Sequence, residues 1–200
     1  LMPFSESNSV DHPVSLYAAS KKSNELMAHT YSHLYGLSAT GLRFFTVYGP
    51  WGRPDMALFI FTKSIIEGKP IKIFNKGKMK RDFTYIKDIT ESLVLIINKP
   101  ATIDLDFDPM KPNPSTSWAP HRIFNIGNSN SINLEEYINV IEKKIGKKAV
   151  REYLEMQPGD VYATEADTNA LQEWINYKPN TKIEIGVSKF IDWFNDFYEY

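Results

Sequence analysis

Helical segments alternate along this chain with short strand-like segments, and no other feature of the sequence limits the fold as strongly. Runs with a helical apolar period predict helices, and short runs rich in β-branched and aromatic residues predict strands. We expect helices at residues 14–34, 57–67, 88–98, 134–145, 168–175 and 183–200, and strands at 37–47, 71–74, 81–86, 121–126 and 149–154. Pro13 marks the start of the first helix, and glycines follow three of the helices. The pattern predicts an α/β fold.

One long segment falls outside this alternation. Residues 100–120 contain five prolines and show little periodicity, so we expect a long surface loop that serves as a lid or an interaction loop. The aromatic residues of the last expected helix are spaced to pack it against the rest of the chain, and they are Phe190, Trp193, Phe194, Phe197 and Tyr198.

Tyr17 and Lys21 stand four residues apart inside the first expected helix. One helical turn puts their side chains on the same face, within reach of each other. A free tyrosine side chain has a pKa near 10 and is a poor base at neutral pH, whereas a neighbouring ammonium group stabilises the phenolate. The spacing therefore suits a tyrosine general base, although an ordinary solvated helix face can carry the same pair.

Charge and composition exclude several classes of function. The formal net charge of -1 gives no reason to expect a nucleic acid or an acidic membrane as partner. Zero cysteines exclude a disulfide scaffold and a thiolate metal site, and they fit a cytoplasmic protein. The sequence contains no run of about 18 apolar residues for a membrane span. Residues 1–6 lack the basic and apolar regions of a signal peptide.

Five short motifs carry a resemblance to a known enzyme family. They are residues 17–21 (YAASK), 43–50 (RFFTVYGP), 52–57 (GRPDMA), 80–83 (KRDF) and 158–161 (PGDV). In their order and spacing the chain resembles the nucleotide-sugar epimerases of the extended short-chain dehydrogenase family, and most of all the bacterial UDP-glucuronate 4-epimerases of capsule synthesis. The resemblance covers essentially the whole chain. It implies part of a Rossmann-type, doubly wound parallel sheet that binds NAD, with a small α/β domain for the UDP-sugar.

The resemblance also implies a division into domains. It places residues 1–50 and 81–127 in the NAD-binding domain and residues 51–80 and 128–200 in the UDP-sugar domain. The Gly-rich turn that binds the NAD pyrophosphate in this family has no counterpart here, and neither has the catalytic serine or threonine that precedes the tyrosine. We therefore expect a chain that corresponds to the C-terminal part of such an enzyme, binds NAD poorly and is inactive by itself.

The family mechanism gives the tyrosine and the lysine their roles. Tyr17, as phenolate, takes the proton of the sugar 4-hydroxyl while NAD takes the C4 hydride, and Lys21 stabilises the phenolate and contacts the nicotinamide ribose. The 4-keto sugar turns over before the hydride returns, which converts UDP-glucuronate to UDP-galacturonate. Phe44 and Phe45 end a strand where the sheet opens onto the cofactor. One of the two is expected in the core, because adjacent strand residues face opposite ways.

Nine residues match positions that hold the UDP-sugar in this family. They are Thr46, Arg53, Ala57, Leu58, Ile71, Lys72, Phe74, Arg81 and Asp160. Galactose-type epimerases have asparagine where this chain has Thr46, and a hydroxyl leaves space for a sugar carboxylate and can hydrogen-bond to it. Arg53 suits a diphosphate or a carboxylate. By resemblance, Arg81 binds the diphosphate, residues 71–74 hold the uracil, and Asp160 binds a ribose hydroxyl.

Each of these assignments has a structural alternative. Arg81 could pair with Asp82, Thr46 could be a buried residue that hydrogen-bonds to the backbone, and Phe74 could belong to the core. Gln157 departs from the family pattern, because an arginine that contacts a phosphate usually stands at this position.

Other functions in the same and in different classes remain open at this stage. They are a UDP-glucose 4-epimerase, a 4,6-dehydratase or decarboxylase, and a non-catalytic module that binds sugar nucleotides. The resemblance implies a homodimer through a four-helix bundle that includes the helix of Tyr17. His29 and His33 have a spacing that could bind a metal, but no third ligand is evident nearby, so we expect an exposed helix surface and no metal site.

Overall fold

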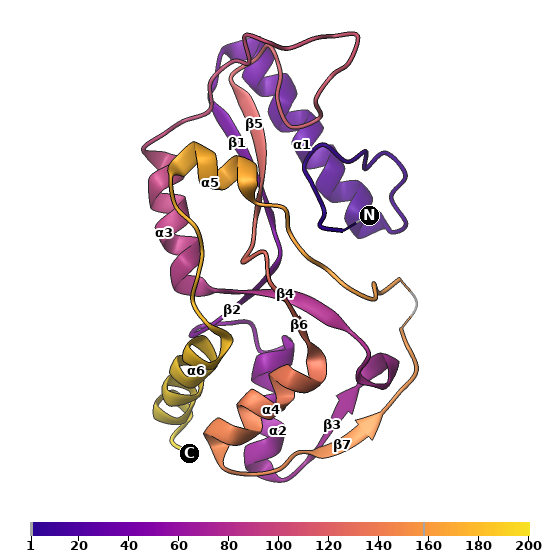
Figure 1. Ribbon diagram of the computed structural model, residues 1–200, viewed down its shortest axis with the longest axis vertical. Coiled ribbons are helices and arrows are strands. Elements are labelled where there is room, and N and C mark those ends of the chain that lie inside the picture. The colour runs from indigo at the N-terminus through magenta and orange to yellow at the C-terminus, as the bar shows by residue number, and fades with distance from the viewer. Residues whose placement is uncertain (1, 158) are drawn as a thin grey trace.

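The structure is a computed structural model that describes residues 2–157 and 159–200, arranged along one long axis (Figure 1). The upper part contains α1 (Leu16–Tyr35), β1 (Ala39–Phe44), α3 (Ile86–Ile97), β5 (His121–Ile126) and α5 (Asn169–Ile175). The lower part contains α2 (Ala57–Glu67), β3 (Pro70–Ile73), α4 (Leu134–Ile145), β7 (Val150–Tyr153) and α6 (Ile183–Tyr198). Between them lie β2 (Thr46–Tyr48), β4 (Lys80–Tyr85) and β6 (Ser131–Asn133).

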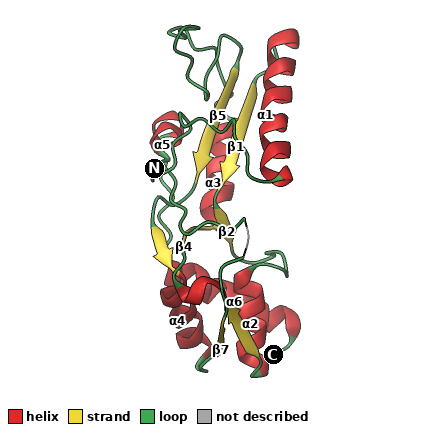
Figure 2. Ribbon diagram, turned by 90° about the vertical axis from the view of Figure 1, so that its right-hand side faces the viewer, coloured by secondary structure: helices red, strands yellow, loops and turns green. Residues whose placement is uncertain are grey.

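The upper part has helices on both sides of a parallel strand pair. β1 pairs with β5 in a register that sets Ala39 opposite His121 and Phe44 opposite Ile126. Figure 2 shows α1 on one side of this pair and α5 on the other. Side chains of α3, α5 and β5 form the upper core, with Ile126 and Leu171 almost completely buried. This layering is that of an α/β sheet covered on both faces.

The lower part is organised around a larger aromatic core. β2 pairs with β4 in parallel, β4 pairs with β6 antiparallel, and β3 pairs with β7 in parallel. α2, α4 and α6 pack together over these strands, and Tyr137, Phe190 and Phe194 are at most 1 % exposed. The outer end of α6 is more accessible, because Phe197 and Tyr198 are about half exposed.

Most of the predicted elements are confirmed. The helices predicted at 57–67 and 134–145 and the strand predicted at 121–126 coincide with α2, α4 and β5. Gly36, Gly68 and Gly146 follow α1, α2 and α4 with φ values of 65°, 70° and 76°. Glycine adopts this left-handed conformation without the steric cost of a Cβ atom, and for this reason the sequence marks these helix ends well. Residues 100–120 form the predicted loop without helix or strand.

Other boundaries differ for identifiable reasons. α1 begins at Leu16 rather than near Pro13, because the Ser15 hydroxyl accepts a hydrogen bond from the Ala18 amide and caps the helix there. The strand predicted at 37–47 is divided at Phe45 into β1 and β2, which pair with different strands. The three-residue strand β6 was not predicted.

Phe74 is not in the predicted strand but opens a short 3₁₀ segment (Phe74–Gly77), in which Asn75 and Lys76 have positive φ.

The division into domains stays a prediction. α5 packs against β5 in the upper core, although the resemblance groups residues 128–200 with the UDP-sugar domain.

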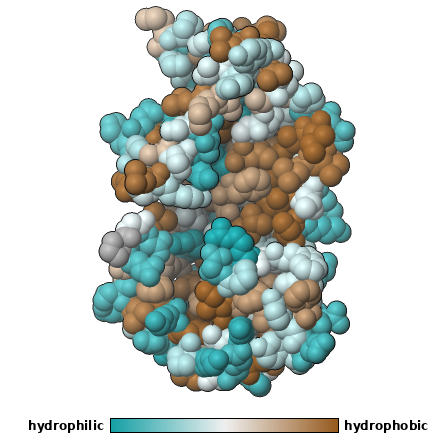
Figure 3. Space-filling model, turned by 180° about the vertical axis from the view of Figure 1, so that it is seen from behind, coloured by the Kyte–Doolittle hydropathy of each residue, from teal (hydrophilic) through white to brown (hydrophobic). Residues whose placement is uncertain are grey.

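The helix α1 covers the strand pair with little apolar burial. Ser32 is its one fully buried residue. Several large apolar side chains point away from the strands and are more than half exposed, and they are Leu16, Tyr17, Leu26, Met27, Tyr31, Leu34 and Tyr35. Seen from behind, the upper half of the molecule has a broad hydrophobic surface (Figure 3). Exposed apolar patches of this kind mark interaction surfaces, ligand-binding grooves or aggregation-prone faces.

Candidate active site and substrate pocket

The predicted tyrosine–lysine pair lies in the first two turns of α1. The Nζ atom of Lys21 is 5.1 Å from the centre of the Tyr17 ring, so the two side chains share one face of the helix as predicted. The Ser20 hydroxyl donates a 2.8 Å hydrogen bond to the Tyr17 carbonyl. Tyr17 is 73 % exposed, which leaves its hydroxyl accessible to a substrate.

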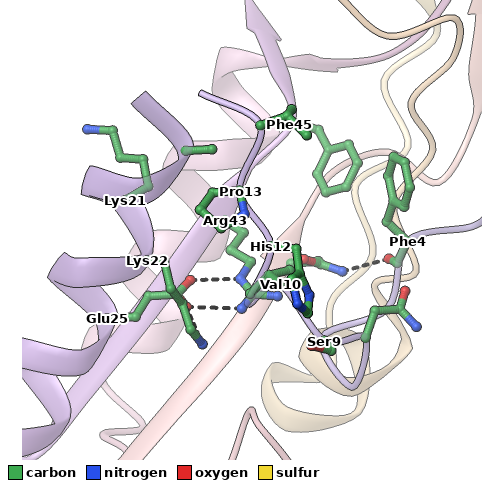
Figure 4. A pocket seen from close by; sticks show the side chains of 14 residues that line it. Phe4, Ser9, Val10, His12, Pro13, Lys21, Lys22, Glu25, Arg43 and Phe45 are labelled. Carbon is green, nitrogen blue, oxygen red and sulfur yellow. Dashed lines mark hydrogen bonds and ion pairs between the residues drawn. The ribbon is translucent and has the colours of Figure 1, made fainter. Parts of the chain in front are cut away.

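A pocket of about 700 Å³ adjoins this helix (Figure 4). Its walls come from the segment before α1, from α1 itself, from β1 and its continuation, and from β5. Lys21 and Phe45, both predicted to bind the cofactor, line it. Phe44 does not line it and is 51 % exposed. The expectation that one of the two phenylalanines is in the core was wrong, because the strand pair is open beside them and neither ring is buried.

A bidentate ion pair fixes α1 against β1 at the wall of this pocket. The Nε and Nη2 atoms of Arg43 donate to Oε1 and Oε2 of Glu25 at 2.7 and 3.0 Å, and Figure 4 shows the two parallel contacts. Burial acts to raise the pKa of Glu25, but Arg43 and the nearby Lys22 lower it overall. Since both side chains are about four-fifths buried, the pair holds α1 in one orientation on the strands.

A buried carboxylate ties the segment before α1 to the end of β5. Glu6 is 4 % exposed and accepts a 2.7 Å hydrogen bond from the Asn125 amide. The Asn125 side chain donates in turn to the carbonyls of Phe4 and Asp167. Burial raises the pKa of Glu6 although the bond from Asn125 lowers it. Sequence reasoning missed this contact, because 119 residues separate its partners and no local motif marks either one.

A second pocket, of about 260 Å³, gathers most of the predicted substrate residues. Thr46, Ala57, Lys72, Phe74, Arg81 and Asp160 line it. They come from β2, α2, β3, the 3₁₀ segment after β3, β4 and the segment after β7. These elements are far apart in the sequence, and the periodicity of the sequence does not predict that they meet at one pocket.

Arg81 and Asp160 face each other in this pocket. Nη2 of Arg81 donates a 2.7 Å hydrogen bond to Oδ1 of Asp160. The alternative pairing of Arg81 with Asp82 was wrong. Asp82 is completely buried and accepts hydrogen bonds from the backbone amides of Asn128, Ser129 and Ala166. Adjacent residues of β4 point to opposite faces, which sends Arg81 toward the pocket and Asp82 away from it.

Arg53 lies on the loop between β2 and α2 and outside this pocket. It is exposed and forms a bidentate ion pair with Asp55, with contacts of 3.0 and 2.6 Å. Hydrogen bonds from Arg53 to Asp55 raise the pKa of Arg53. A narrow cavity of about 50 Å³ next to it is also lined by Thr46 and Ala57.

Two of the predicted substrate residues have side chains that are buried in the lower core. Ile71 is 1 % exposed and Leu58 is 4 % exposed, and both belong to the lower core. Leu58 also lines the narrow cavity beside Arg53. Ile71 can reach a ligand through its backbone alone, which is the kind of contact that the family resemblance implies for this segment.

The two histidines of α1 are not on a plain exposed surface. His29 Nε2 lies 3.0 Å from Ser117 Oγ, and the Trp118 indole donates to His33 Nδ1 at 3.1 Å, so both hold the long loop against α1. Within residues 2–157 and 159–200, no group of three or more histidine, cysteine or acidic side chains is placed to hold a metal. In the same ranges no helix is both long and apolar enough to cross a membrane.

Comparison with known proteins decides the family. The sequence profile of the NAD dependent epimerase/dehydratase family matches residues 2–127. The chain belongs to this family. Protein CapI of Staphylococcus aureus is 53 % identical over 197 residues, which are 98 % of this chain and 59 % of that protein. The probable UDP-glucuronate 4-epimerase of Rhizobium meliloti is 44 % identical over 198 residues, which are 98 % of this chain and 58 % of that protein.

The fold of this epimerase-family chain matches that of solved relatives. A crystal structure of UDP-glucuronic acid 4-epimerase from Bacillus cereus, in complex with UDP-glucuronic acid and NAD, superposes with a TM-score of 0.78 at 31 % identity. The match covers 94 % of this chain and 55 % of that one. The chain thus spans a little more than half the length of the relatives it matches. The predicted family, its Rossmann-type α/β fold and its NAD dependence are confirmed.

Proposed function

We propose that this chain contributes the catalytic base and the UDP-sugar pocket of an NAD-dependent 4-epimerase that interconverts UDP-glucuronate and UDP-galacturonate. The observation that carries the proposal is the pocket in which Arg81, Asp160, Phe74 and Lys72 meet Thr46. The relatives at 44 % and 31 % identity bear the name UDP-glucuronate 4-epimerase and support the same substrate.

At the sugar ring, Tyr17 acts as the base. Its exposed hydroxyl takes the proton of the sugar 4-hydroxyl, and Lys21 stabilises the phenolate from 5.1 Å. The pocket beside α1 offers the cation of Lys21 next to the apolar side chains of Phe45 and Val14, a set that suits a nicotinamide ring and its ribose. NAD, when bound there, supplies the acceptor for the C4 hydride. Glu25 and Arg43 hold α1 so that Lys21 faces this pocket.

At the sugar carboxylate, we assign Thr46 and Arg53. Thr46 lies where the pocket of about 260 Å³ and the narrow cavity beside Arg53 meet, since it lines both. Its hydroxyl can donate to a carboxylate oxygen. Arg53 already binds one carboxylate, that of Asp55, through two parallel hydrogen bonds. A substrate carboxylate can take the same bidentate geometry in place of Asp55.

At the nucleotide end, we assign Arg81 to the diphosphate and Asp160 to a ribose hydroxyl. Phe74 offers a ring and Lys72 a backbone at the far side of the same pocket, where the uracil would lie. Ala57 and Leu58 stand at the start of α2, whose N-cap residue Met56 makes no side-chain capping bond, so we assign phosphate oxygens to the amides of that first turn. The pocket in this arrangement takes the UDP portion, and Tyr17 takes the sugar.

We further propose that the protein is a cytoplasmic homodimer through α1. The exposed apolar side chains of this helix need a partner surface, and a second copy of the helix presents the same set. Tyr31 and Leu34, two large side chains of this helix, are at least 60 % exposed. Sedimentation of the chain should show a dimer, and Tyr31→Glu combined with Leu34→Glu should shift it to a monomer.

Calorimetric titration tests the proposed substrate. The chain should bind UDP-glucuronate and UDP measurably and should bind NAD much more weakly. Arg81→Met should weaken binding of both UDP ligands about tenfold or more, whereas Lys80→Met, one residue away and exposed, should leave it unchanged. Equal binding of NAD and UDP-glucuronate would contradict this assignment of the two pockets.

A further inference from the structure

Trp51 adopts a backbone conformation that its side chain disfavours. The amide of Gly52 donates a 3.1 Å hydrogen bond to the Gly49 carbonyl, which closes a four-residue turn from Gly49 to Gly52. Pro50 occupies the second position of this turn, and Trp51 occupies the third with a φ of 64°. Turns with proline second and a positive φ third usually have glycine or asparagine there, because a Cβ atom is crowded in this region. A tryptophan at this position requires an explanation.

The explanation lies in the aromatic side chains of α6. The Trp51 ring is 5.3 Å from the ring centre of Trp193 and 5.0 Å from that of Phe197. Trp193 and Phe197 stack on each other at 5.5 Å. Trp51 is nevertheless 73 % exposed, so it covers this stack from outside rather than filling a core. These aromatic contacts stabilise the left-handed conformation.

The same turn leads directly into Arg53. A Cβ atom on Gly49 would lie 2.4 Å from Ile86, so close packing against α3 fixes the start of the loop. Its end is fixed just before α2, where the Met56 amide donates to the Arg53 carbonyl at 3.1 Å. Between these points, Trp51 attaches the loop to α6. The exposed Arg53 side chain therefore leaves a loop that is attached to α6 through Trp51.

We propose that Trp51 is a positioning residue for substrate recognition, which holds Arg53 toward the carboxylate of the sugar by packing on Trp193 and Phe197. The inference rests on the proposed function, since it takes Arg53 as the carboxylate-binding residue. It gives α6, which contributes no lining residue to the Arg81 pocket, a part in selecting the sugar. Backbone strain of this kind persists where the surroundings impose it, and it is common beside ligand sites.

Trp51→Gly and Trp51→Phe separate a positioning role from a structural one. Glycine suits a positive φ but removes the ring and its contacts with Trp193 and Phe197, so loss of a purely structural tryptophan would change the melting temperature and affect binding of the two sugars equally. For a positioning role, Trp51→Gly should weaken binding of UDP-glucuronate about tenfold in calorimetric titration and change that of UDP-glucose less than twofold. Trp51→Phe keeps an aromatic ring and should restore most of the difference. Trp118→Phe, on the distant loop, serves as the control.

A second measurement follows the loop without any ligand. Hydrogen exchange of the Gly52 and Met56 amides should accelerate at least fivefold in Trp51→Gly and stay near the wild-type rate in Trp51→Phe. Unchanged exchange, or an equal loss of affinity for both sugars, would overturn the positioning role while leaving the substrate assignment intact. A wild-type chain that binds UDP-glucose as tightly as UDP-glucuronate would overturn the carboxylate assignment, and this inference with it.

Discussion

Arg81 and Asp160 form a hydrogen bond of 2.7 Å across 79 residues of sequence, at the wall of the pocket that we assign to UDP. Both side chains are less than one-third exposed. The Asp160 carboxylate also accepts the amide of Val161 at 2.8 Å. The pair therefore joins β4 to the segment after β7 and presents a cation and an acceptor to the same ligand.

The first prediction follows from this pair. Asp160→Asn should keep the fold, because the amide oxygen still accepts from Arg81 and Val161, but it should weaken the bond by removing the charge. A hydrogen bond to a charged group is worth about 1.5–3 kcal/mol. Arg81→Met should therefore lower the affinity for UDP about tenfold or more, measured by calorimetry. Asp160→Asn should lower it by a smaller factor, and a larger effect of Asp160→Asn would reverse the roles given to the two residues.

The sequence predicts local features of this fold better than long-range ones. Helix ends are marked by glycines, so α2 and α4 were predicted to the residue, whereas the cap at Ser15 that begins α1 was missed. The division of the strand at Phe45 depends on which partner strand each half meets, and no periodicity carries that information.

The candidate site shows the same limit. The five motifs identify Tyr17, Lys21 and Arg81 through the family, but Glu6 lies outside them and the motif that contains Asp82 does not predict its structural role. Both are buried acids that accept backbone amides from distant segments. Burial raises the pKa of Asp82 despite its three amide donors. Only the folded chain shows where such an acid finds its donors.

The second prediction concerns stability at low pH. Glu142 is 4 % exposed in α4. Burial acts to raise its pKa, but hydrogen bonds from Lys148, from the Ala149 amide and from Arg151 lower it to about 2. A depressed folded-state pKa means that Glu142 stabilises the fold above its ordinary value of 4.5 and that this contribution is lost as the pH falls from about 4.5 toward 2.

Glu142→Gln tests this prediction by thermal unfolding. At pH 7 the substitution should destabilise the chain by about 2 kcal/mol, since it weakens buried hydrogen bonds to charged partners. At pH 3 the difference between the variant and the wild type should be much smaller. Glu136→Gln, on the exposed side of the same helix, should have little effect at either pH. A cost that is independent of pH would show that Glu142 contributes by packing rather than by charge.

The third prediction concerns the base, in an active enzyme that contains this chain. Tyr17→Phe should lower kcat by at least 10²–10⁴-fold, because general base catalysis is typically worth that much. UDP-sugar binding should be nearly unchanged, since the ring remains. Tyr35→Phe, an exposed tyrosine near the end of α1, is the matched control. A fall in kcat below tenfold for Tyr17→Phe would exclude this hydroxyl as the base.

The fourth prediction concerns Lys21. Lys21→Met should lower kcat and move the acidic limb of the pH–rate profile to higher pH, because the phenolate loses its nearest cation and the pKa of the Tyr17 base rises. A profile that keeps its position while kcat falls would limit Lys21 to binding the cofactor. Glu25→Gln should lower kcat without moving the profile, since Glu25 acts on the orientation of α1 through Arg43.

The last prediction concerns the choice of sugar, and it rests on the place of Thr46 between the two substrate cavities. Thr46→Asn replaces a hydroxyl with a bulkier amide, so it should crowd a carboxylate at C6 more than a hydroxymethyl group. We expect kcat/KM for UDP-glucuronate to fall about tenfold more than kcat/KM for UDP-glucose, which corresponds to about 1.4 kcal/mol of lost discrimination. Thr46→Ser keeps the hydroxyl and should preserve the preference. If Thr46→Asn lowers both values equally, Thr46 is structural, and recognition of the carboxylate falls to Arg53 alone.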